Sequence, residues 1–372
     1  MKIGIEAKWL FRGPPSGQRV VLNLVESLVD SAGDDEIHFF LDARSRDRVP
    51  AVEIPRDRRH YVWAGNNQLS NVFLVPRIAD RLGLDVVVYQ NFAPPAYAVR
   101  HKRVAFVHDV IFDSHPQFFT WRERLYFKPL RRLTSTADRV CTVSQSEIAR
   151  LVRFNYAAAE RIDVVPNAVD ATFAPRECLR PLLVSDVRRA LDLPDVFVLY
   201  VGRLTARKNV ETLIRAMAYV ASPVTLVVVG VRDRTSLDLD AVAKSCGVDR
   251  RVRFLGPLAV GDDRLRVLYA DATVFCFPSL EESFGLPPLE AMASGTPVIV
   301  SNVAAVVETC GDAAVFIDPT DARAIAEAID ALMNDSARRA ELRAAGLARA
   351  ESFSWARSAQ RLLATAHAAA AS

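Results

Sequence analysis

Two carboxylates, Glu282 and Glu290, stand with seven residues between them in the second half of a 372-residue chain. The segment that carries them follows an apolar run, 272–277, which is typical of a buried strand. Gly285 permits a tight backbone path between the two, and Pro287 suits the first turn of a helix. A strand followed by a glycine loop and a helix N-terminus forms an anion site from backbone N–H groups. We therefore predict that this segment binds a diphosphate, with the two carboxylates holding sugar hydroxyls on either side.

A second group of charged residues, Arg203 and Lys208, follows the apolar run 196–201. Two cations that leave the end of a strand just before a helix are placed to face departing phosphates. The chain contains neither a GxGxxG dinucleotide turn nor a GxxxxGK[ST] loop, so the phosphates must be held by this other arrangement. We expect Asn209 to cap the helix that follows.

Short β-branched and aromatic runs alternate with helical patterns along the whole chain, which predicts βαβ units and parallel sheets. The expected strands are residues 2–6, 37–41, 59–63, 85–90, 103–108, 139–143, 161–165, 196–201, 225–229, 251–255, 272–277, 297–301 and 313–317. We therefore expect an α/β fold made of two doubly wound, Rossmann-like domains that face a cleft. Ligands of such folds bind at the carboxyl ends of the strands.

The two domains are expected to meet within residues 171–195, where prolines punctuate a poorly periodic stretch. The first domain is then 1–175 and the second is 190–352. The last segment, 353–372, has a helical pattern, and we expect it to pack back on the first domain.

Charge and composition exclude several classes of protein. The net charge of +3 is too small to indicate nucleic-acid binding, and no nucleic-acid motif is present. The five cysteines are scattered without a CxxC pair, which favours a reducing cytoplasm. The chain begins with a strand-like run, and no apolar stretch approaches the roughly 20 residues of a membrane span. Asp238 and Asp240 have the DxD spacing of a metal site, but a helix cap explains them better, so we expect no metal and no cofactor.

Residues 118–132 combine cations with aromatic side chains. Such a stretch suits an anionic membrane surface, but Pro129 interrupts it and the aromatics equally suit a packed core. Thr120 and Glu123 have the spacing of a capping box. Both interpretations stay open for a set that comprises Phe118, Phe119, Trp121, Arg122, Arg124, Tyr126, Phe127, Lys128, Arg131 and Arg132.

The charged segments resemble glycosyltransferase family 4, a group of retaining transferases with the GT-B fold. The Glu282/Glu290 pair matches the signature spacing of that family within SLEESFGLPPLEAMASGTPVIVSN, and VGRLTARKN matches around Arg203 and Lys208. Further matches are VAFVHDVIFDSHPQFF, CTVSQSEIARL, VVPNAVD and GDAAVFIDPTD. The resemblance spans nearly the whole chain. It is greatest to enzymes of bacterial surface polysaccharides and lipid-linked oligosaccharides, many of which use GDP-mannose.

This resemblance implies a role for each candidate residue. Glu290 would bind the ribose hydroxyls of the donor, and Glu282 would contact the transferred sugar. Arg203 and Lys208 would neutralise the diphosphate in place of a metal ion. His108 would lie at the reacting sugar, where it would hydrogen-bond a hydroxyl and shield developing positive charge. The other donor-binding residues would be Gly17, Gly202, Ser283, Phe284, Gly285 and Leu286.

The loop around Gly17 departs from the family pattern, which has two or three glycines where this chain has Ser16 and Gln18 beside one. A glutamine side chain there would contact a substrate or simply narrow the loop. The approach of this loop to the phosphates is an implication of the resemblance alone.

We expect a metal-independent retaining hexosyltransferase that acts in the cytoplasm. Peripheral association with the inner face of the membrane stays open together with the interpretation of residues 118–132. The donor would be GDP-mannose, and the acceptor a sugar hydroxyl of a glycan or lipid-linked molecule. Two other classes stay open. A nucleotide-sugar epimerase would convert the donor without any acceptor, and a non-catalytic subunit of a glycan-assembly complex would bind the donor without turnover.

Overall fold

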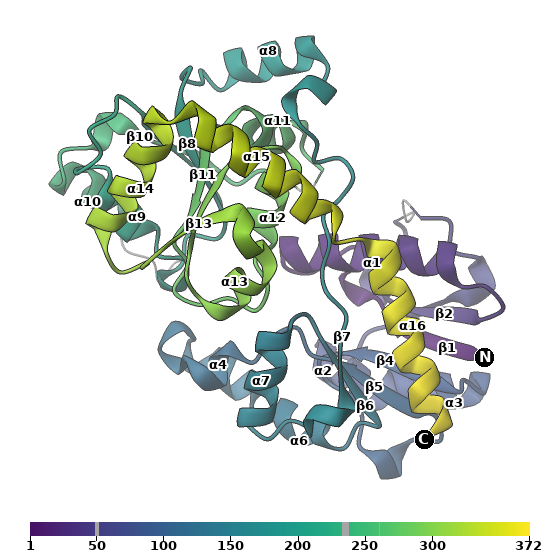
Figure 1. Ribbon diagram of the computed structural model, residues 1–372. Coiled ribbons are helices and arrows are strands. Elements are labelled where there is room, and N and C mark those ends of the chain that lie inside the picture. Colours follow the sequence, from purple (N-terminus) through teal and green to yellow (C-terminus); the bar gives the residue numbers. More distant parts are fainter. Residues whose placement is uncertain (49–51, 233–237, 260) are drawn as a thin grey trace. The chain divides into compact units, whose positions relative to one another are not determined.

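The computed structural model describes residues 1–48, 52–232, 238–259 and 261–372, and it divides into two compact units (Figure 1). The first unit comprises Met1–Asn167 together with Ser354–Ser372, and the second comprises Ala168–Phe353. Each unit is a parallel β-sheet covered by helices.

The first unit is built on a sheet whose order is β3-β2-β1-β4-β5-β6-β7 among the described residues, with every neighbouring pair parallel. The order reverses between β1 and β4, so these two strands flank the topological switch point. Strand β4 is buried along its whole length, as a central parallel strand must be. The strands are β1 Lys2–Glu6, β2 Glu36–Asp42, β3 Arg59–Val62, β4 Val86–Gln90, β5 Lys102–Phe106, β6 Arg139–Thr142 and β7 Ile162–Val164.

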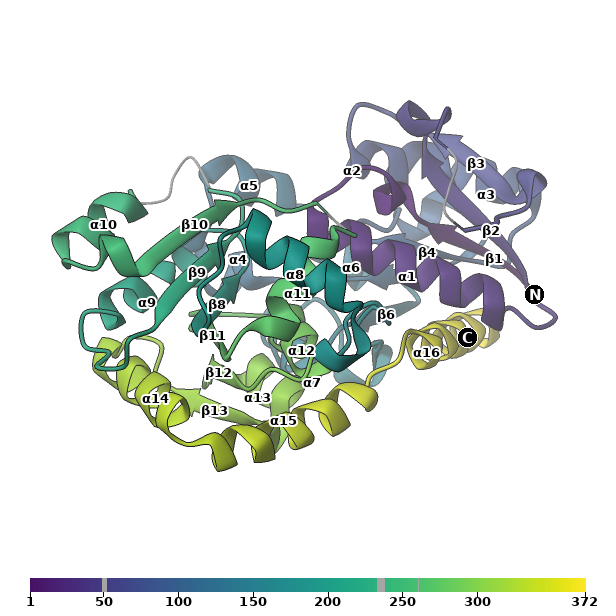
Figure 2. The ribbon, with the colours of Figure 1, turned by 90° about the horizontal axis from the view of Figure 1, so that it is seen from above.

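The helices of this unit include the last one of the chain, α16, which lies along α1 (Figures 1 and 2). Ser358 on α16 donates a hydrogen bond to the carbonyl oxygen of Pro166 (2.6 Å), and His367 is paired with Asp35 at 2.8 Å. The helices are α1 Pro15–Ser31, α2 Asn67–Leu69, α3 Val75–Leu82, α4 Ile111–Ser114, α5 Trp121–Phe127, α6 Leu130–Ser135, α7 Gln145–Arg153 and α16 Trp355–Ala371.

The second unit has a parallel sheet of order β10-β9-β8-β11-β12-β13 within its described part, and its switch point lies between β8 and β11. The strands are β8 Phe197–Val201, β9 Thr225–Val229, β10 Val252–Gly256, β11 Val274–Phe277, β12 Val298–Ser301 and β13 Ala314–Ile317. The helices are α8 Pro181–Ala190, α9 Val210–Ala216, α10 Leu239–Ser245, α11 Asp263–Asp271, α12 Leu286–Ala293, α13 Ala304–Cys310, α14 Ala322–Asn334 and α15 Ser336–Glu351.

The structure confirms the predicted α/β class, since every expected strand is present with its ends within two residues of the predicted ones. The first unit ends at Asn167, whereas the sequence analysis placed that end at residue 175. The segment after Asn167 belongs to the second unit because α8 packs on α11, where Val184 and Val187 contact Val267.

Two of the three predicted helix caps are confirmed. Thr120 and Glu123 form a reciprocal capping box at the start of α5, and the Asp238 carboxylate accepts from the backbone N–H of Asp240 at the start of α10. The prediction for Asn209 is wrong in its chemistry: this residue occupies the N-cap position of α9, but its side chain does not cap the helix.

Asn209 instead has a left-handed backbone with φ of 55° and points its amide at two other loops. Its Nδ2 donates to the carbonyl oxygens of Pro278 (3.0 Å) and Pro319 (2.6 Å). Because these prolines follow β11 and β13, the buried amide ties together three chain segments at the carboxyl edge of the sheet.

Candidate active site

One predicted cation, Lys208, and one predicted carboxylate, Glu282, meet at the switch point of the second unit. Gly202, Arg203 and Lys208 follow β8, and Glu282 follows the neighbouring strand β11. The carboxyl ends of two parallel neighbours lie at the same edge, and there the loops diverge to opposite faces of the sheet. The fold therefore brings together Lys208 and Glu282, which are 74 positions apart in the chain.

An ion-pair cluster joins these two loops. Lys208 Nζ donates to Glu282 Oε1, and Arg207 lies 3.2 Å from Glu282 Oε2. Ser279 donates its hydroxyl to Glu282 Oε1 at 2.6 Å. The backbones are joined as well, since the N–H of Leu280 donates to the Arg207 carbonyl at 2.8 Å. Glu282 is thus held by three side chains, of which the sequence analysis had named one.

The cluster stays ionised near neutral pH. Burial alone would raise the pKa of Glu282, but the charges and hydrogen bonds of Lys208 and Arg207 outweigh it and lower that pKa to about 2. Burial lowers the pKa of Lys208 to about 8, although Glu282 opposes this shift. The Lys208 ammonium also lies 4.7 Å from the ring centroid of Phe277. A compact positive group is therefore held at the strand ends with one carboxylate as its partner.

Glu290 lies one turn into α12 and is 3% exposed. Tyr269 on α11 donates its hydroxyl to Glu290 Oε2 at 2.8 Å. Helix α12 begins after Gly285, whose φ is 106°, and Pro287 stands in its first turn. Gly295 (φ 75°) follows the last turn of the helix, where a left-handed glycine is common. Gly285 and Pro287 thus set where α12 begins, and this start places Glu290 one turn into the helix.

The short loop between the two carboxylates contributes backbone more than side chains. Phe284 is buried, its ring packs edge-on against Phe353 at 5.5 Å, and its carbonyl accepts from the Thr309 hydroxyl at 2.7 Å. Ser283 and Leu286 are half-buried. The Phe284 side chain is therefore a core residue of the second unit, which leaves only backbone groups of this position for any donor.

His108 lies in the first unit, just after β5. Its Nε2 is 2.6 Å from Gln90 Oε1, and its ring stacks on Trp9 (5.7 Å between centroids) and on Phe106 (4.7 Å). Burial lowers the pKa of His108 to about 4. The imidazole is therefore neutral at pH 7.

Gly17 lies in the first turn of α1, against the indole of Trp9. A Cβ on Gly17 would lie 2.9 Å from Trp9 Cε3, and one on Gly13 would lie 2.9 Å from Trp9 Cγ. Both glycines are thus required by the close approach of this ring, which stacks in turn on His108. The resemblance implied that the loop of Gly17 approaches the phosphates, and that implication stays a prediction.

Comparison with known proteins decides the family. Residues 17–173 match the model described as Glycosyltransferase Family 4, and residues 186–349 match the model described as Glycosyl transferases group 1. The O-antigen chain mannosyltransferase B of Escherichia coli is 31% identical over 91% of this chain and 92% of its own length. The chain belongs to glycosyltransferase family 4.

Other relatives agree with this assignment. The serotype-specific mannosyltransferase WbdA of Escherichia coli is 30% identical over 71% of this chain, but the match spans only 33% of that longer protein. Among solved structures, Anabaena Alr3699/HepE in complex with UDP and glucose superposes with a TM-score of 0.76 over 99% of this chain and all of that one, at 20% identity. The fold is accordingly that of the GT-B glycosyltransferases.

Sequence reasoning on this family 4 member missed four residues that the structure adds to the site. Arg207, Ser279 and Tyr269 bind the two carboxylates, and Gln90 binds the imidazole. Arg207 had a detectable signal, since it adjoins Lys208 in the sequence. Ser279 had a local signal as well, since it lies three residues before Glu282. Tyr269 and Gln90 had none, because their partners are distant in the chain.

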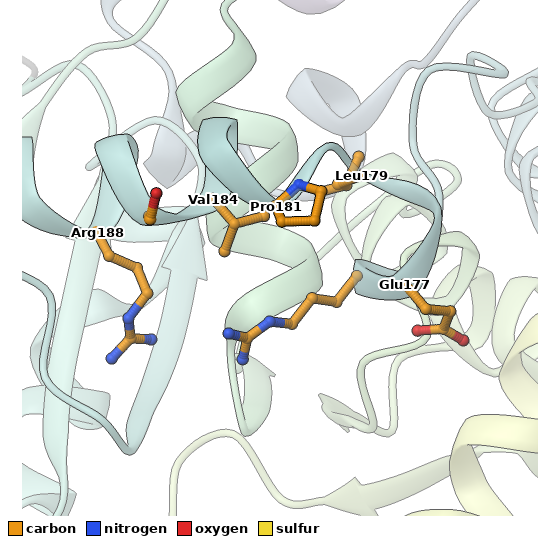
Figure 3. Close-up of a pocket in the computed structure, with 7 residues that line it drawn as sticks. Glu177, Leu179, Pro181, Val184 and Arg188 are labelled. Atoms are coloured by element: carbon orange, nitrogen blue, oxygen red, sulfur yellow. The ribbon is translucent and has the colours of Figure 1, made fainter.

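Two further observations concern metal binding and a pocket of the second unit. The described residues contain no group of three or more His, Cys, Asp or Glu side chains that could hold a metal ion. A pocket of about 440 Å³ lies beside α8 (Figure 3). Both of its arginines are paired with the buried Asp271, and Glu177 is paired with Arg343. It is lined by Arg176, Glu177, Leu179, Pro181, Val184, Ser185 and Arg188.

Proposed function

We propose that this protein transfers a hexose, namely mannose from GDP-mannose, to a sugar hydroxyl of a glycan or lipid-linked acceptor with retention of anomeric configuration. The observation that carries the proposal is the Lys208–Glu282–Arg207 cluster at the β8/β11 switch point, with Glu290 on the helix that follows. A switch point is where doubly wound sheets bind nucleotides. We place the reaction in the cytoplasm.

The choice of mannose rests on relatives. The two Escherichia coli proteins are mannosyltransferases by name, and one of them aligns over nearly its whole length. The HepE structure holds UDP and glucose, but at 20% identity it speaks for the fold alone. Because these relatives are mannosyltransferases by name, and many enzymes that the sequence resembles use GDP-mannose, we favour guanine as the base. The experiment below tests guanine against uracil.

The proposed chemistry is positioning and charge stabilisation. Lys208 and Arg203 neutralise the diphosphate as it leaves, with the N-terminus of α12 adding positive potential, so that no metal ion is required. Glu282 exchanges its contact with Lys208 for sugar hydroxyls when the donor binds. The acceptor oxygen attacks the anomeric carbon on the face from which the phosphate departs, and the departing phosphate oxygen takes the acceptor's proton. The bond made and the bond broken thus lie on one face, which retains the configuration.

Glu290→Ala tests the donor site. If Glu290 holds the ribose, its removal weakens GDP and GDP-mannose equally, by about 1.5–3 kcal/mol for a hydrogen bond to a charged group. This corresponds to a rise in Kd of roughly 10- to 150-fold. Titration calorimetry with GDP, UDP and GDP-mannose measures the effect and shows which base is preferred.

Two variants control this measurement. Tyr269→Phe removes only the hydroxyl that holds Glu290 Oε2, so we expect a smaller rise in Kd in the same direction. Glu327→Ala removes an exposed glutamate from α14 and should leave Kd unchanged. An unaltered Kd for GDP in a folded Glu290→Ala protein would exclude the ribose role.

Turnover separates this function from its rivals. Incubation with GDP-mannose and no acceptor would convert the donor if the protein were an epimerase. Donor binding without turnover on any sugar acceptor would indicate a non-catalytic subunit.

We also propose that α5 docks on anionic lipid. Trp121 and Leu125, which lie one turn apart on this helix, are 67% and 60% exposed. The surrounding cations are exposed too. Phe119, Tyr126 and Phe127 pack on the core of the first unit. Each of the two interpretations of residues 118–132 thus fits a different part of the stretch: the exposed residues suit a membrane surface, and the packed aromatics belong to the core. Among the described residues, no helix is long and apolar enough to cross a bilayer. Docking would therefore be peripheral at α5.

Liposome flotation tests the docking. Vesicles that contain anionic lipid should retain the protein at low salt and release it at high salt, because charges at a surface are screened beyond a Debye length. Replacing Arg122, Lys128 and Arg131 with glutamine should abolish retention. Replacing Arg189, Arg250 and Arg338, which are exposed in the second unit, removes the same charge and should not. Equal loss with both sets would show that net charge alone governs binding.

A further inference from the structure

A buried polar network lies at the switch point of the first unit, beside the strand end that carries Gln90. Glu6 ends β1 and is fully buried, and Lys8, 1% exposed, lies 3.4 Å from its Oε1. Asn71, on a π-helical turn at Ser70–Leu74, accepts a hydrogen bond from Lys8 Nζ and donates to Glu6 Oε2 at 3.2 Å. A buried ion pair is costly to assemble and gives little net stability, so its placement at the carboxyl ends of β1 and β4 needs another reason.

The network binds both backbone polar groups of Gln90. The Gln90 N–H donates to Glu6 Oε2 at 3.2 Å, and the Gln90 carbonyl oxygen accepts from Asn71 Nδ2 at 3.2 Å. The side chain of Gln90 is thereby fixed at the end of β4 and is itself buried at 2% exposure. The Gln90 side chain is thus positioned for the 2.6 Å hydrogen bond between its Oε1 and His108 Nε2.

That contact indicates where the proton of His108 lies. An amide oxygen only accepts hydrogen bonds, so Nε2 must carry a hydrogen that it donates to Gln90 Oε1. In a neutral imidazole the other nitrogen, Nδ1, is then an acceptor. Nδ1 has no hydrogen-bond partner in the described part of the chain, and the residue is half-buried. Stacking on Trp9 and Phe106 holds the plane of the ring.

We propose that Gln90 is a positioning residue of the transfer reaction, which holds His108 as the Nε2–H tautomer so that Nδ1 accepts a hydrogen bond from a hydroxyl of the transferred sugar. This rests on the proposed function for its substrate. A hydroxyl that donates to Nδ1 gains electron density on its oxygen, and this favours the positive charge that develops on the sugar ring. A neutral acceptor serves this purpose where an imidazolium would oppose it, and burial keeps His108 neutral.

The tautomer is read directly from the ring nitrogens. In ¹⁵N-labelled protein at pH 7, long-range ¹H–¹⁵N spectra should show a protonated, pyrrole-type Nε2 and an unprotonated, pyridine-type Nδ1 for His108, assigned by its absence in His108→Ala. A protonated Nδ1, or two protonated nitrogens, would overturn the proposal. His101 gives an internal reference because it is buried between Asp80 and Tyr89, 2.7 Å from each.

Gln90→Met removes the acceptor and keeps the length of the side chain. We expect kcat to fall about tenfold, since small misplacements of a catalytic group cost up to about 100-fold, with KM and the Kd for GDP within about twofold. The His108 nitrogen shifts should move toward a mixture of tautomers, while those of His101 stay in place. Gln90→Glu keeps an acceptor at Nε2, so at pH 8 it should recover more of kcat than the methionine variant. An unchanged kcat in a folded Gln90→Met protein would refute the positioning role.

Failure of the proposed function would look different. If the protein bound no nucleotide and transferred no sugar, the proposed transfer from GDP-mannose would be refuted. The tautomer of His108 is measured on the free protein, so that result does not depend on any substrate. If Gln90→Met does not fold, the spectrum of the parent protein still decides the tautomer.

Discussion

Replacing Lys208 with alanine is expected to raise the activation free energy of transfer by about 3–4 kcal/mol and so to lower kcat roughly 100- to 1,000-fold. This is the range for losing one donor to a developing oxyanion. Lys208 is the cation bonded to Glu282 at the β8/β11 switch point, and its ammonium is nearly buried. Fixed charge in such a site needs no reorganisation when the phosphate departs. Loss of the cation therefore raises the barrier more than it weakens donor binding.

A second consequence follows from the geometry of the pair. Without Lys208, the carboxylate of Glu282 keeps Arg207 and Ser279 as partners, so the loop after β11 should hold its place. Lys208→Arg retains the charge and should recover part of kcat. Arg215→Ala removes an exposed cation that pairs with Glu211 on α9 and should leave kcat unchanged. Steady-state kinetics with GDP-mannose and a sugar acceptor measure all three, and a kcat for Lys208→Ala within fivefold of the parent would contradict the role.

The same assay tests whether the cations act in place of a metal ion. We expect the transfer by the parent protein to survive excess EDTA, because Lys208 and Arg203 supply the positive charge. Complete loss of activity on chelation, with recovery on adding magnesium or manganese, would refute metal independence. It would also reopen the role of Asp240, which is paired with Arg232 in this structure.

The strands could be predicted from the sequence because their burial is written in their composition. A parallel strand that is covered on both faces must be apolar at nearly every position, as in Thr225–Val229, so each run identifies itself without a partner. Helix caps with local partners were predictable for the same reason. The capping box of Thr120 and Glu123 depends on two residues that are three positions apart.

The contacts that define the site could not be predicted because they join distant parts of the chain. Nothing in the sequence pairs Glu282 with Arg207, or His108 with Gln90, since each contact depends on which strands become neighbours. Asn209 shows how distant contacts also made one local prediction wrong. Its type and position indicate a helix cap, but the closeness of the loops at Pro278 and Pro319 offers its amide better partners.

Gly230→Ala should cost more stability than any other single methyl group at the site, at least about 4 kcal/mol of the free energy of unfolding. Gly230 follows β9, and a Cβ there would lie 1.8 Å from the carbonyl oxygen of Gly202. Neither backbone can yield easily, because the N–H of Gly202 donates to Val229 and that of Gly230 to Gly256, both at 3.0 Å. A φ of 157° adds strain for any residue with a side chain.

Gly247→Ala is the matched control, since Gly247 also has a positive φ, 69°, but nothing lies within 4 Å of the added carbon. Its cost should be only the intrinsic one of a left-handed alanine, about 1–2 kcal/mol. The difference between the two variants in urea unfolding isolates the clash with Gly202. Because Gly202 begins the loop that carries Arg203 and Lys208, relief of that clash must displace the cations, and Kd for GDP should rise in Gly230→Ala alone. Equal destabilisation in both variants would show that the backbone angle, and not the close approach of the two loops, makes glycine necessary after β9.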